Sequence, residues 1–339
     1  MSGLLKLSKD EEDRAKELHS KAIVINAMDP THNHDFNEFY IKQLIEGGLT
    51  AVSTASIHLQ YDNFRSSING IKCFYKILEK FDDKMFLATS VDDIYKAKRE
   101  NRIALLFALR NLSPIEDDIG LLTIMHKLGV RISQLTYHLG NLVGGGCDER
   151  TSYGLTKYGL QAVEELNRLG ILIDLAHTNY ETFMDAIEVT KAPLSYTHGS
   201  ASSLSDHMRN LKDDQIKALA EKEGVMGICA LSPFLKPQGP IMRTTIDDFL
   251  DHIDYVRDLV GIDYVGLGID VGGIRTKEDE ENETPGGWCW GPSFAEGLED
   301  PTGMINVTRG LVHRGYSDQE ILKVLGENFI KIYKKVWKE

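Results

Sequence analysis

The chain has 339 residues, of which 42% are hydrophobic and 26% are charged, a composition typical of a globular enzyme. Its 51 acidic residues outnumber its 38 basic residues, and the formal net charge of −13 excludes nucleic-acid binding because an acidic surface repels phosphate. No segment reaches the roughly 18 apolar residues of a membrane span, and the charged start, residues 1–22, lacks the apolar core of a signal peptide. We therefore expect a cytoplasmic protein that binds neither membranes nor nucleic acid.

Eight short, apolar and β-branched segments alternate with helical segments along the chain. We predict strands at 22–25, 49–57, 103–109, 131–137, 171–176, 192–197, 225–231 and 264–269. Helices are predicted between them at 37–46, 117–127, 159–169, 180–190, 212–223 and 246–260. This alternation favours a closed (β/α)8 TIM barrel of the α/β class, with an open doubly wound sheet as the alternative.

Both ends of the chain carry helices outside this alternation. Ser8 and Glu11 have the spacing of a capping box, which predicts an N-terminal helix from about residue 8 to 20. Two C-terminal helices are predicted at 306–313 and 317–337. No linker rich in Pro, Gly or Ser divides the chain, so residues 1–339 are predicted to form a single barrel domain. The irregular segment 275–300 follows the last strand, where a barrel has its lid loops.

Metal-ligand side chains stand at the C-terminal ends of three predicted strands, where a barrel gathers its active site. His177, His198 and Asp270 end the fifth, sixth and eighth strands, and imidazole and carboxylate groups bind first-row metal ions. Zinc is the default choice, since it lowers the pKa of bound water to about 7 and supplies hydroxide for attack on a carbonyl. Asp270 could carry the proton of that water to a leaving amine. The alternative for each residue is a polar group with a purely structural role.

Other features of the sequence point to a ligand less directly. Arg209 lies in the loop after the sixth strand, where a guanidinium suits a substrate carboxylate, and a surface salt bridge is the alternative. The glycines at 144–146 lack the spacing of a phosphate-binding loop and are interpreted as a turn. The four cysteines are scattered without a C-x-x-C pair, so we interpret them as reduced structural thiols: Cys73, Cys147, Cys229 and Cys289.

Several motifs, in order, resemble the membrane (renal) dipeptidase family of the amidohydrolase superfamily. They are residues 170–177, 193–200, 209–214, 265–270 and 326–329, together with the segment 141–150 that is similar to a bacterial subgroup. The resemblance runs from about residue 20 to the C-terminus and implies a barrel of the metal-dependent hydrolase type. Such a barrel carries two zinc ions and hydrolyses dipeptides that have a free C-terminal carboxylate. The resemblance implies that His177 and His198 hold the second metal, that Asp270 binds the first metal and moves the proton, and that Arg209 binds the substrate carboxylate.

The sequence departs from the family pattern at the remaining ligand positions. Met28 and Pro30 stand where the family has a histidine and an aspartate at the end of the first strand. Arg110 stands where the family has a glutamate that bridges the metals, and Tyr137, with His138 beside it, stands where the family has a substrate-binding histidine. A guanidinium about 4 Å from a divalent cation is repelled by roughly 8 kcal/mol at an effective dielectric near 20. We therefore predict a degraded metal site with one zinc ion, or none, in which Arg110 is placed to pair with Asp270.

Three residues near the first strand are additional candidate ligands: Asp29, His32 and His34. Asp29 is one residue out of register with the family's ligands, and a slip of one residue turns a strand side chain to the other face. The two histidines reach the mouth only if the following loop folds back into it.

The sequence leaves three functions open on this barrel. The first, which we favour, is a dipeptidase-like hydrolysis of an amide bond in a small substrate with a free carboxylate, with one zinc at His177 and His198. The second is a non-hydrolytic lyase or decarboxylase in which Arg110 takes the place of a metal, and the third is a non-catalytic homologue. The residues expected to act are the catalytic Asp270 and Arg110 and the substrate-binding Arg209, Tyr137 and His138. The expected partner is a dipeptide or another small molecule, and a homo-oligomer is left open.

Overall fold

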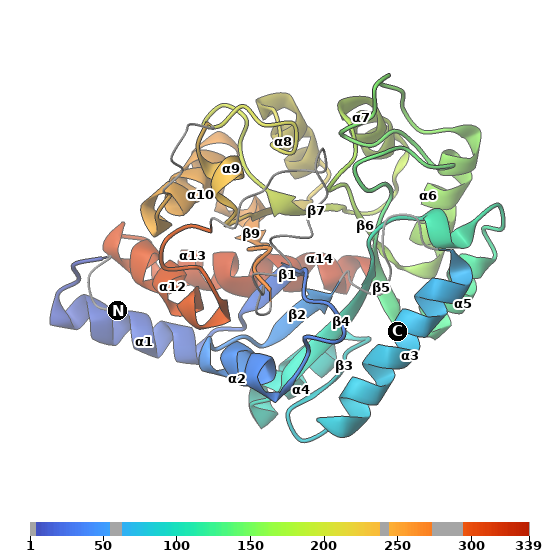
Figure 1. The fold of residues 1–339 in the computed structure, drawn as a ribbon. Helices are drawn as coiled ribbons and strands as arrows, with labels where there is room; N and C mark the ends of the chain where they lie inside the picture. The colour runs from blue at the N-terminus through green and yellow to red at the C-terminus, as the bar shows by residue number, and fades with distance from the viewer. Residues whose placement is uncertain (1–4, 55–62, 238–243, 273–293, 339) are drawn as a thin grey trace, which may run out of the picture.

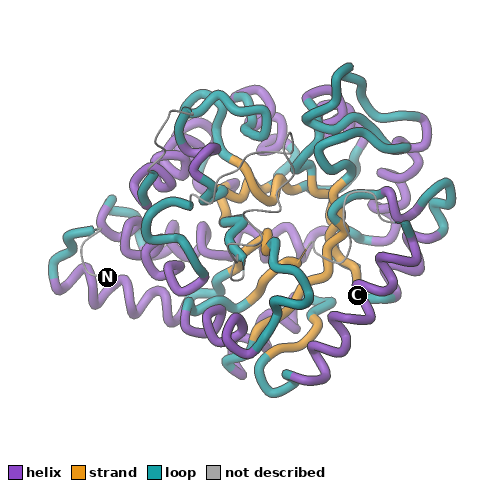
Figure 2. Tube along the Cα trace, viewed as in Figure 1, coloured by secondary structure: helices purple, strands orange, loops and turns teal. Residues whose placement is uncertain are grey.

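Eight parallel strands form a nearly closed ring in the computed structural model, which describes residues 5–54, 63–237, 244–272 and 294–338. In ring order the strands are β1 (Ile25–Asp29), β2 (Ala51–Thr54), β4 (Ile103–Leu109), β5 (Val130–Gln134), β6 (Leu172–Asp174), β7 (Ser195–Gly199), β8 (Val225–Ile228) and β9 (Val265–Leu267). Neighbouring strands along this path pair in parallel. Helices surround the strands (Figures 1 and 2), so the prediction of an α/β TIM barrel is confirmed.

The helices between strands form the outer layer of the barrel. They are α2 (Glu38–Glu46), α3 (Phe64–Lys80), α4 (Val91–Glu100), α5 (Leu121–Lys127), α6 (Lys157–Leu169), α7 (Tyr180–Val189), α8 (Asp213–Glu221), α9 (Ser232–Leu235) and α10 (Ile246–Val260). Helix α1 (Lys9–Lys21) precedes β1 and begins with the predicted capping box, in which the Ser8 backbone N–H donates to Glu11 Oε2 at 2.7 Å. Across the described ranges, no helix combines the length and apolarity needed to cross a membrane.

Successive residues of β4 pack into two different apolar clusters. Ile103, Leu105, Phe107 and Leu109 belong to the cluster shared with the outer helices. Ala104, Leu106 and Ala108 belong to a cluster shared with Ile25, Ile132, Leu172 and Val225 of other strands, which is the interior of the barrel. Side chains of a strand alternate between its two faces, so Arg110 continues the row that faces inward, at the C-terminal end of β4.

Helix α14 (Asn328–Val336) closes the opposite end of the barrel. The Asn328 side chain donates to the Val265 carbonyl at 2.7 Å, at the start of β9, and the Trp337 indole donates to the Arg131 carbonyl at 3.1 Å, near the start of β5. β9 and β5 lie four places apart in the ring of eight, so the helix spans the floor. Its Phe329 and Tyr333 join the inner cluster. Among the described residues, α14 therefore covers the N-terminal end of the barrel, and the C-terminal rim lies at the other end.

Two parts of the fold differ from the sequence predictions. A ninth strand, β3 (Met85–Leu87), lies between α3 and α4 and pairs with residues Ile103–Leu105 of β4, outside the ring path. The predicted helix at 317–337 is broken into α13 (Asp318–Leu322), a π-helical segment (Lys323–Glu327) and α14. The break occurs at Gly326, where an added Cβ would lie 2.3 Å from the Ile23 carbonyl oxygen. The chain needs glycine there to pass this carbonyl.

The first strand is displaced, because it was predicted at 22–25 and β1 is Ile25–Asp29. Several other predicted segments agree in place but not in length. Helix α12 (Met304–His313) covers the predicted helix at 306–313. The predicted strands at 131–137 and 225–231 end earlier, at Gln134 and Ile228. Residues 135–137 and 229–231, which were predicted to lie in these strands, are part of the loops at the C-terminal rim. Most of the segment 275–300 lies outside the described residues, as do positions 55–57 of the second predicted strand.

The side chain of Asn26 bridges the two ends of the ring path. Its Oδ1 accepts a hydrogen bond from the Ile269 backbone N–H at 3.1 Å and from the Met28 N–H at 3.3 Å. Asn26 is 1% exposed, so water cannot replace these bonds. This one amide links β1 to the residues that follow β9.

We predict that Asn26→Ala lowers the free energy of unfolding by about 1–3 kcal/mol, because the buried Ile269 N–H loses its acceptor. Urea denaturation checks this. Asn69→Ala, at an exposed position of α3, is the control and should change stability by less than about 0.5 kcal/mol. Equal stabilities for the two variants would show that the bridge is unimportant.

Candidate active site

Two buried histidines face each other at the C-terminal rim. His177 follows β6 and His198 is part of β7, and their Nε2 atoms lie 3.0 Å apart. Both imidazoles are almost fully buried. At this distance one Nε2 must donate its hydrogen to the other, so the pair satisfies itself when no ion lies between the rings.

A short chain of hydrogen bonds orients this pair. Thr197 Oγ1 donates to Asp174 Oδ2 at 2.6 Å and lies 2.9 Å from His198 Nδ1. Burial raises the pKa of Asp174. While this carboxylate is ionised it can only accept, so the Thr197 hydroxyl donates to it and His198 Nδ1 donates to Thr197. His198 Nε2 is then the acceptor and His177 Nε2 the donor. The lone pair of His177 therefore lies on Nδ1, which is buried and has no hydrogen-bond partner among the described atoms.

Two glycines hold the backbone that carries His198. An added Cβ at Gly268 would lie 1.7 Å from the Thr197 carbonyl oxygen, and one at Gly227 would lie 2.1 Å from it. Only residues without a side chain let β8 and the end of β9 approach β7 so closely. The position of His198 is therefore fixed by its neighbouring strands as well as by Thr197.

Arg110 lies against an aromatic group beside the histidine pair. Its Cζ stands 4.9 Å from the centre of the Tyr137 ring, and that ring lies 4.2 Å from the His177 ring. The His138 ring packs against His177 at 4.5 Å. Arg110 is only 8% exposed, and its Nε has no partner within the described part of the chain. Arg110 does not form the ion pair with Asp270 that was expected, since no such pair lies within 4.0 Å.

Arg209 approaches the same histidines from the loop after β7. It is 2% exposed, its Nη2 donates to the His198 carbonyl at 3.3 Å, and its Cζ lies 5.4 Å from the Phe234 ring. Burial lowers the pKa of Arg209, but Tyr196, Cys147 and Asp270 outweigh that effect and hold the pKa above its ordinary value. Arg209 is therefore a buried cation in the mouth, and the surface salt-bridge alternative does not hold for it.

The histidines of the site stay neutral near pH 7. Burial, followed by the positive charge of Arg209, holds the pKa of His177 and of His198 well below the ordinary value. Burial, with Arg209 and Arg110, lowers the pKa of His138 to about 3. Neutral imidazoles can bind a metal ion or accept a proton.

Strained backbone is concentrated at this rim. In the described ranges six residues other than glycine have positive φ angles, and three of them are His138 (56°), His177 (68°) and Asp270 (53°). Such conformations cost of order 1–3 kcal/mol each and cluster at functional sites. All three residues lie in loops at the C-terminal rim.

Cys147 is a site candidate that the sequence analysis missed. One ligand atom each from His138, Cys147 and His177 lie within 4.8 Å of one another, the one such group of three in the described chain. The Cys147 N–H donates to the His177 carbonyl at 2.9 Å. An added Cβ at Gly146 would lie 2.1 Å from the His138 carbonyl oxygen, so the glycine run allows this approach. Burial raises the pKa of the Cys147 thiol. The run of three glycines at 144–146 was the sequence feature that could have indicated the approach of Cys147.

The candidate ligands near β1 do not join the histidine pair. Asp29 accepts from the Tyr40 hydroxyl of α2 at 2.6 Å and from the Thr31 N–H at 2.9 Å, and burial raises its pKa. A register shift lies between Asn26 and Asp29. His32 and His34 are exposed, with rings 5.6 Å apart. The structure therefore gives no local replacement for the ligands that the first strand lacks.

Among the described residues, the side chains fit one metal ion but not two. Two nitrogens bound to one zinc at about 2.0–2.1 Å can be at most about 4.2 Å apart, and the Nε2 atoms of His177 and His198 are closer than that. At the other position Met28 is buried in the inner apolar cluster, Pro30 has no ligand atom, and Arg110 brings a positive charge. The binuclear arrangement that the family resemblance implies does not fit this chain.

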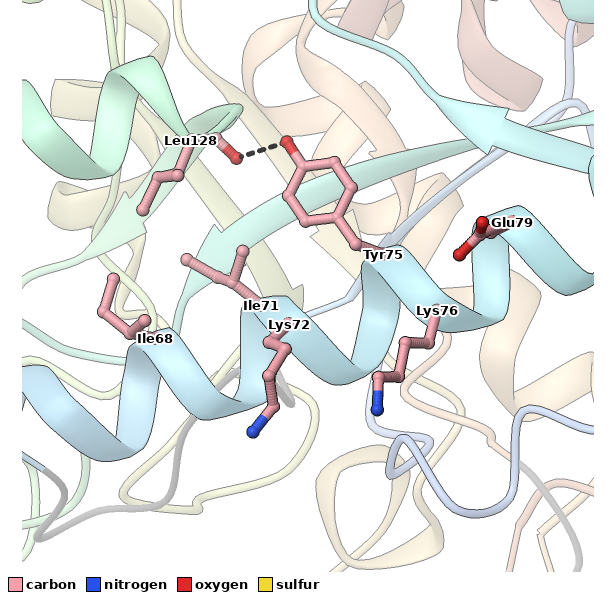
Figure 3. A pocket seen from close by; sticks show the side chains of 7 residues that line it. All are labelled: Ile68, Ile71, Lys72, Tyr75, Lys76, Glu79 and Leu128. Atoms are coloured by element: carbon pink, nitrogen blue, oxygen red, sulfur yellow. Dashed lines mark hydrogen bonds between the residues drawn. The ribbon is translucent and has the colours of Figure 1, made fainter.

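A surface groove elsewhere has a different character. It is lined by Ile68, Ile71, Lys72, Tyr75, Lys76, Glu79 and Leu128, with the Tyr75 hydroxyl donating to the Leu128 carbonyl at 3.2 Å (Figure 3). The groove runs along the outside of α3, and Leu128 lies just before β5, at the N-terminal end of the strands. The C-terminal rim, and not this groove, holds the chemistry.

Comparisons with known proteins identify a family. The profile of the membrane dipeptidase family (peptidase family M19) matches residues 13–284. The dipeptidase tcpJ of Claviceps purpurea is 29% identical over 283 residues, covering 82% of this chain, and an uncharacterized dipeptidase of Schizosaccharomyces pombe is 30% identical over 280 residues, covering 80%. The chain spans 61% and 62% of these two relatives, less than two thirds of either.

Solved structures share the whole fold. An amidohydrolase from Pseudomonas aeruginosa superposes with a TM-score of 0.88 at 32% identity, covering 96% of this chain and 99% of that one. A metallopeptidase from Rhodobacter sphaeroides, bound to a phosphinate mimic of the dipeptide L-Ala-D-Ala, superposes with a TM-score of 0.77 at 18% identity, covering 94% and 100%. The second likeness is one of fold alone.

The buried neutral histidines make a prediction about pH. Because the folded pKa of His138 is about 3 and the unfolded value is about 6.5, the unfolded chain binds the proton first as the pH falls. The contribution of His138 is complete above about pH 6.5 and is lost below it, by about 1.4 kcal/mol per pH unit. His138→Gln should therefore lose less stability than the wild type between pH 6.5 and 5, as measured by urea denaturation. The exposed His34→Gln is the control, and a wild-type slope in His138→Gln contradicts the prediction.

Proposed function

Because this chain belongs to the membrane dipeptidase family (peptidase family M19), we propose that it is a dipeptidase-like hydrolase. It cleaves an amide bond in a small substrate that has a free carboxylate. The observation that carries this proposal is the buried pair His177–His198 beside the buried guanidinium of Arg209. The pair offers ligands for one ion, and the guanidinium offers a site for the carboxylate.

Arg209 would bind and orient the substrate. It is held by the His198 carbonyl and by the Phe234 ring, so its direction is set before the ligand arrives. A guanidinium can bind a carboxylate through two parallel hydrogen bonds, which fixes the orientation of the carboxylate as well as its position. The scissile amide of a dipeptide would then lie toward the histidines.

His177 and His198 would hold a single zinc ion through their Nε2 atoms. His138, Cys147 and His177 offer a second possible set of ligand atoms, which lie within 4.8 Å of one another. The ion would supply Lewis acidity at the scissile carbonyl. To bind it, both Nε2 atoms must be free of hydrogen, so the hydrogen of His177 has to move from Nε2 to Nδ1, which leaves the imidazole neutral. Thr197 and Asp174 keep the other hydrogen of His198 on Nδ1 and so fix the tautomer that a ligand needs.

Asp270 would move the proton. It lies at the end of β9 near Arg209, as the effect of its carboxylate on the pKa of Arg209 indicates. A carboxylate in this position can accept a proton from the attacking water and return it to the leaving amine.

A second candidate function follows from Arg110. A buried guanidinium with a free Nε, next to histidines that stay neutral, suits a non-hydrolytic reaction on an anionic substrate. In that case the imidazoles would transfer protons and no ion would be needed.

Elemental analysis of the purified protein, followed by a dipeptide panel, tests the first candidate. We expect about one zinc per chain, loss of that zinc in His177→Ala, and release of free amino acids from at least one dipeptide. The matched control is His34→Ala, which removes an exposed imidazole and should keep both zinc and activity. A folded, zinc-free and inactive wild type would favour the second candidate, and two zinc ions per chain would contradict the ligand assignment.

The nearly isosteric variant Thr197→Val tests the hydrogen bonds that link Asp174, Thr197 and His198. We expect zinc affinity or activity to fall about 10-fold to 100-fold, because His198 loses the group that fixes its tautomer. Zinc titration against a competing chelator measures the affinity. Thr123→Val, on α5, removes a hydroxyl far from the rim and should change neither quantity. Equal affinities in the two variants would count against a role for Thr197.

A further inference from the structure

We propose that the ligand of this mouth carries two separated acidic groups, one bound by Arg209 and the other by Arg110. The inference rests on the proposed function for the first group and extends it by naming the substrate class. In a dipeptide the second acid would be an aspartate or glutamate side chain. In any other small substrate it would be a second carboxylate of comparable reach.

Arg110 has the features of an anion-binding side chain. It continues the inward-facing row of β4, is 8% exposed, and has a buried Nε without a partner among the described residues. The contact that holds its guanidinium is the face of Tyr137, which leaves the in-plane hydrogens free for a carboxylate. No carboxylate of the described chain lies within 4.0 Å of it. A buried cation without a partner is costly, so an anionic ligand would relieve that cost.

Arg209 shares these features with Arg110. It is 2% exposed and its Nε is also buried without a partner in the described part of the chain. Both guanidinium groups act on the same three imidazoles, those of His138, His177 and His198. The two cations therefore flank one cluster and do not belong to separate sites.

A ligand with a single acid leaves one guanidinium of the mouth without a direct anionic partner. The imidazoles are neutral, and the carboxylates of the described chain near the cluster, Asp270, Asp148 and Asp174, act on Arg209, Cys147 and Thr197. None of them forms an ion pair with Arg110 within 4.0 Å, and a divalent ion on the histidines would add two further positive charges. A substrate with one carboxylate would leave Arg110 uncompensated, whereas a substrate with two acids would occupy both guanidinium groups.

Calorimetric titration of the full chain with simple acids tests this directly. The dicarboxylates malonate, succinate and glutarate are compared with the monocarboxylates propionate and butyrate. We expect the best dicarboxylate to bind at least 10-fold more tightly than either monocarboxylate, with an optimum at one chain length. Equal affinities of the two kinds of acid for the wild type would overturn the proposal, and this arm needs no variant.

Variants then assign each acid to a cation. Arg110→Gln should remove the preference for dicarboxylates and leave monocarboxylate binding unchanged, whereas Arg209→Gln should weaken both. Arg110→Lys keeps the charge and should retain part of the preference, which separates loss of charge from loss of packing. Arg99→Gln, at an exposed position of α4, is the charge-matched control. A preference that survives Arg110→Gln overturns the proposal.

Two further arms separate this inference from the proposed hydrolase. If the protein hydrolyses dipeptides but does not favour those with acidic side chains, the proposed hydrolase function stands and the proposal of a second acidic group is wrong. If dicarboxylates bind through Arg110 but no dipeptide is cleaved, the proposal of a second acidic group stands and the hydrolase function is wrong. Inorganic phosphate serves as a compact dianion. Phosphate binding that needs both arginines and exceeds that of every dicarboxylate would show that the cations meet on one group, which contradicts two separated acids.

Discussion

Closure of the parallel strands is the constraint on which the site depends. The C-terminal ends of parallel strands meet at one rim only if the sheet curves far enough to bring β1 back to β9. Here the Asn26 amide spans that junction and α14 closes the floor. The same closure brings Gly227 and Gly268 against the Thr197 carbonyl. The distance between His177 and His198 is therefore a property of the whole ring.

Charge gives this rim its individual character. In a binuclear site a carboxylate between two cations lowers their mutual repulsion, and the family resemblance aligns Arg110, of opposite charge, with that position. Burial is the main reason that the pKa values of His177 and His198 are lowered, and the positive charge of Arg209 and Arg110 adds to it. Under the proposed function, this exchange would favour anionic ligands, while the barrel and the hydrogen bonds of Thr197 with Asp174 and His198 are present.

The sequence predicted the features that depend on local pattern. Alternating apolar segments identified eight strands, and strand ends identified His177, His198 and Arg209, which the structure brings together. The strand β3 was missed because three residues are too few to show a period. The break at Gly326 depends on a carbonyl of Ile23, and the approach of Cys147 depends on a loop folding back, so neither is visible in local pattern. Whether Asp29 faces α2 or the mouth depends on a register shift in β1.

The left-handed backbone at His138, His177 and Asp270 has a consequence for protein engineering. Glycine adopts this conformation without strain, and asparagine adopts it more readily than histidine does. Replacing these residues with glycine or asparagine would relieve strain while removing the side chains on which the proposed function depends. A screen that rewards thermostability alone would therefore enrich barrels without the proposed site, so improved variants need selection for stability and for the proposed function at once.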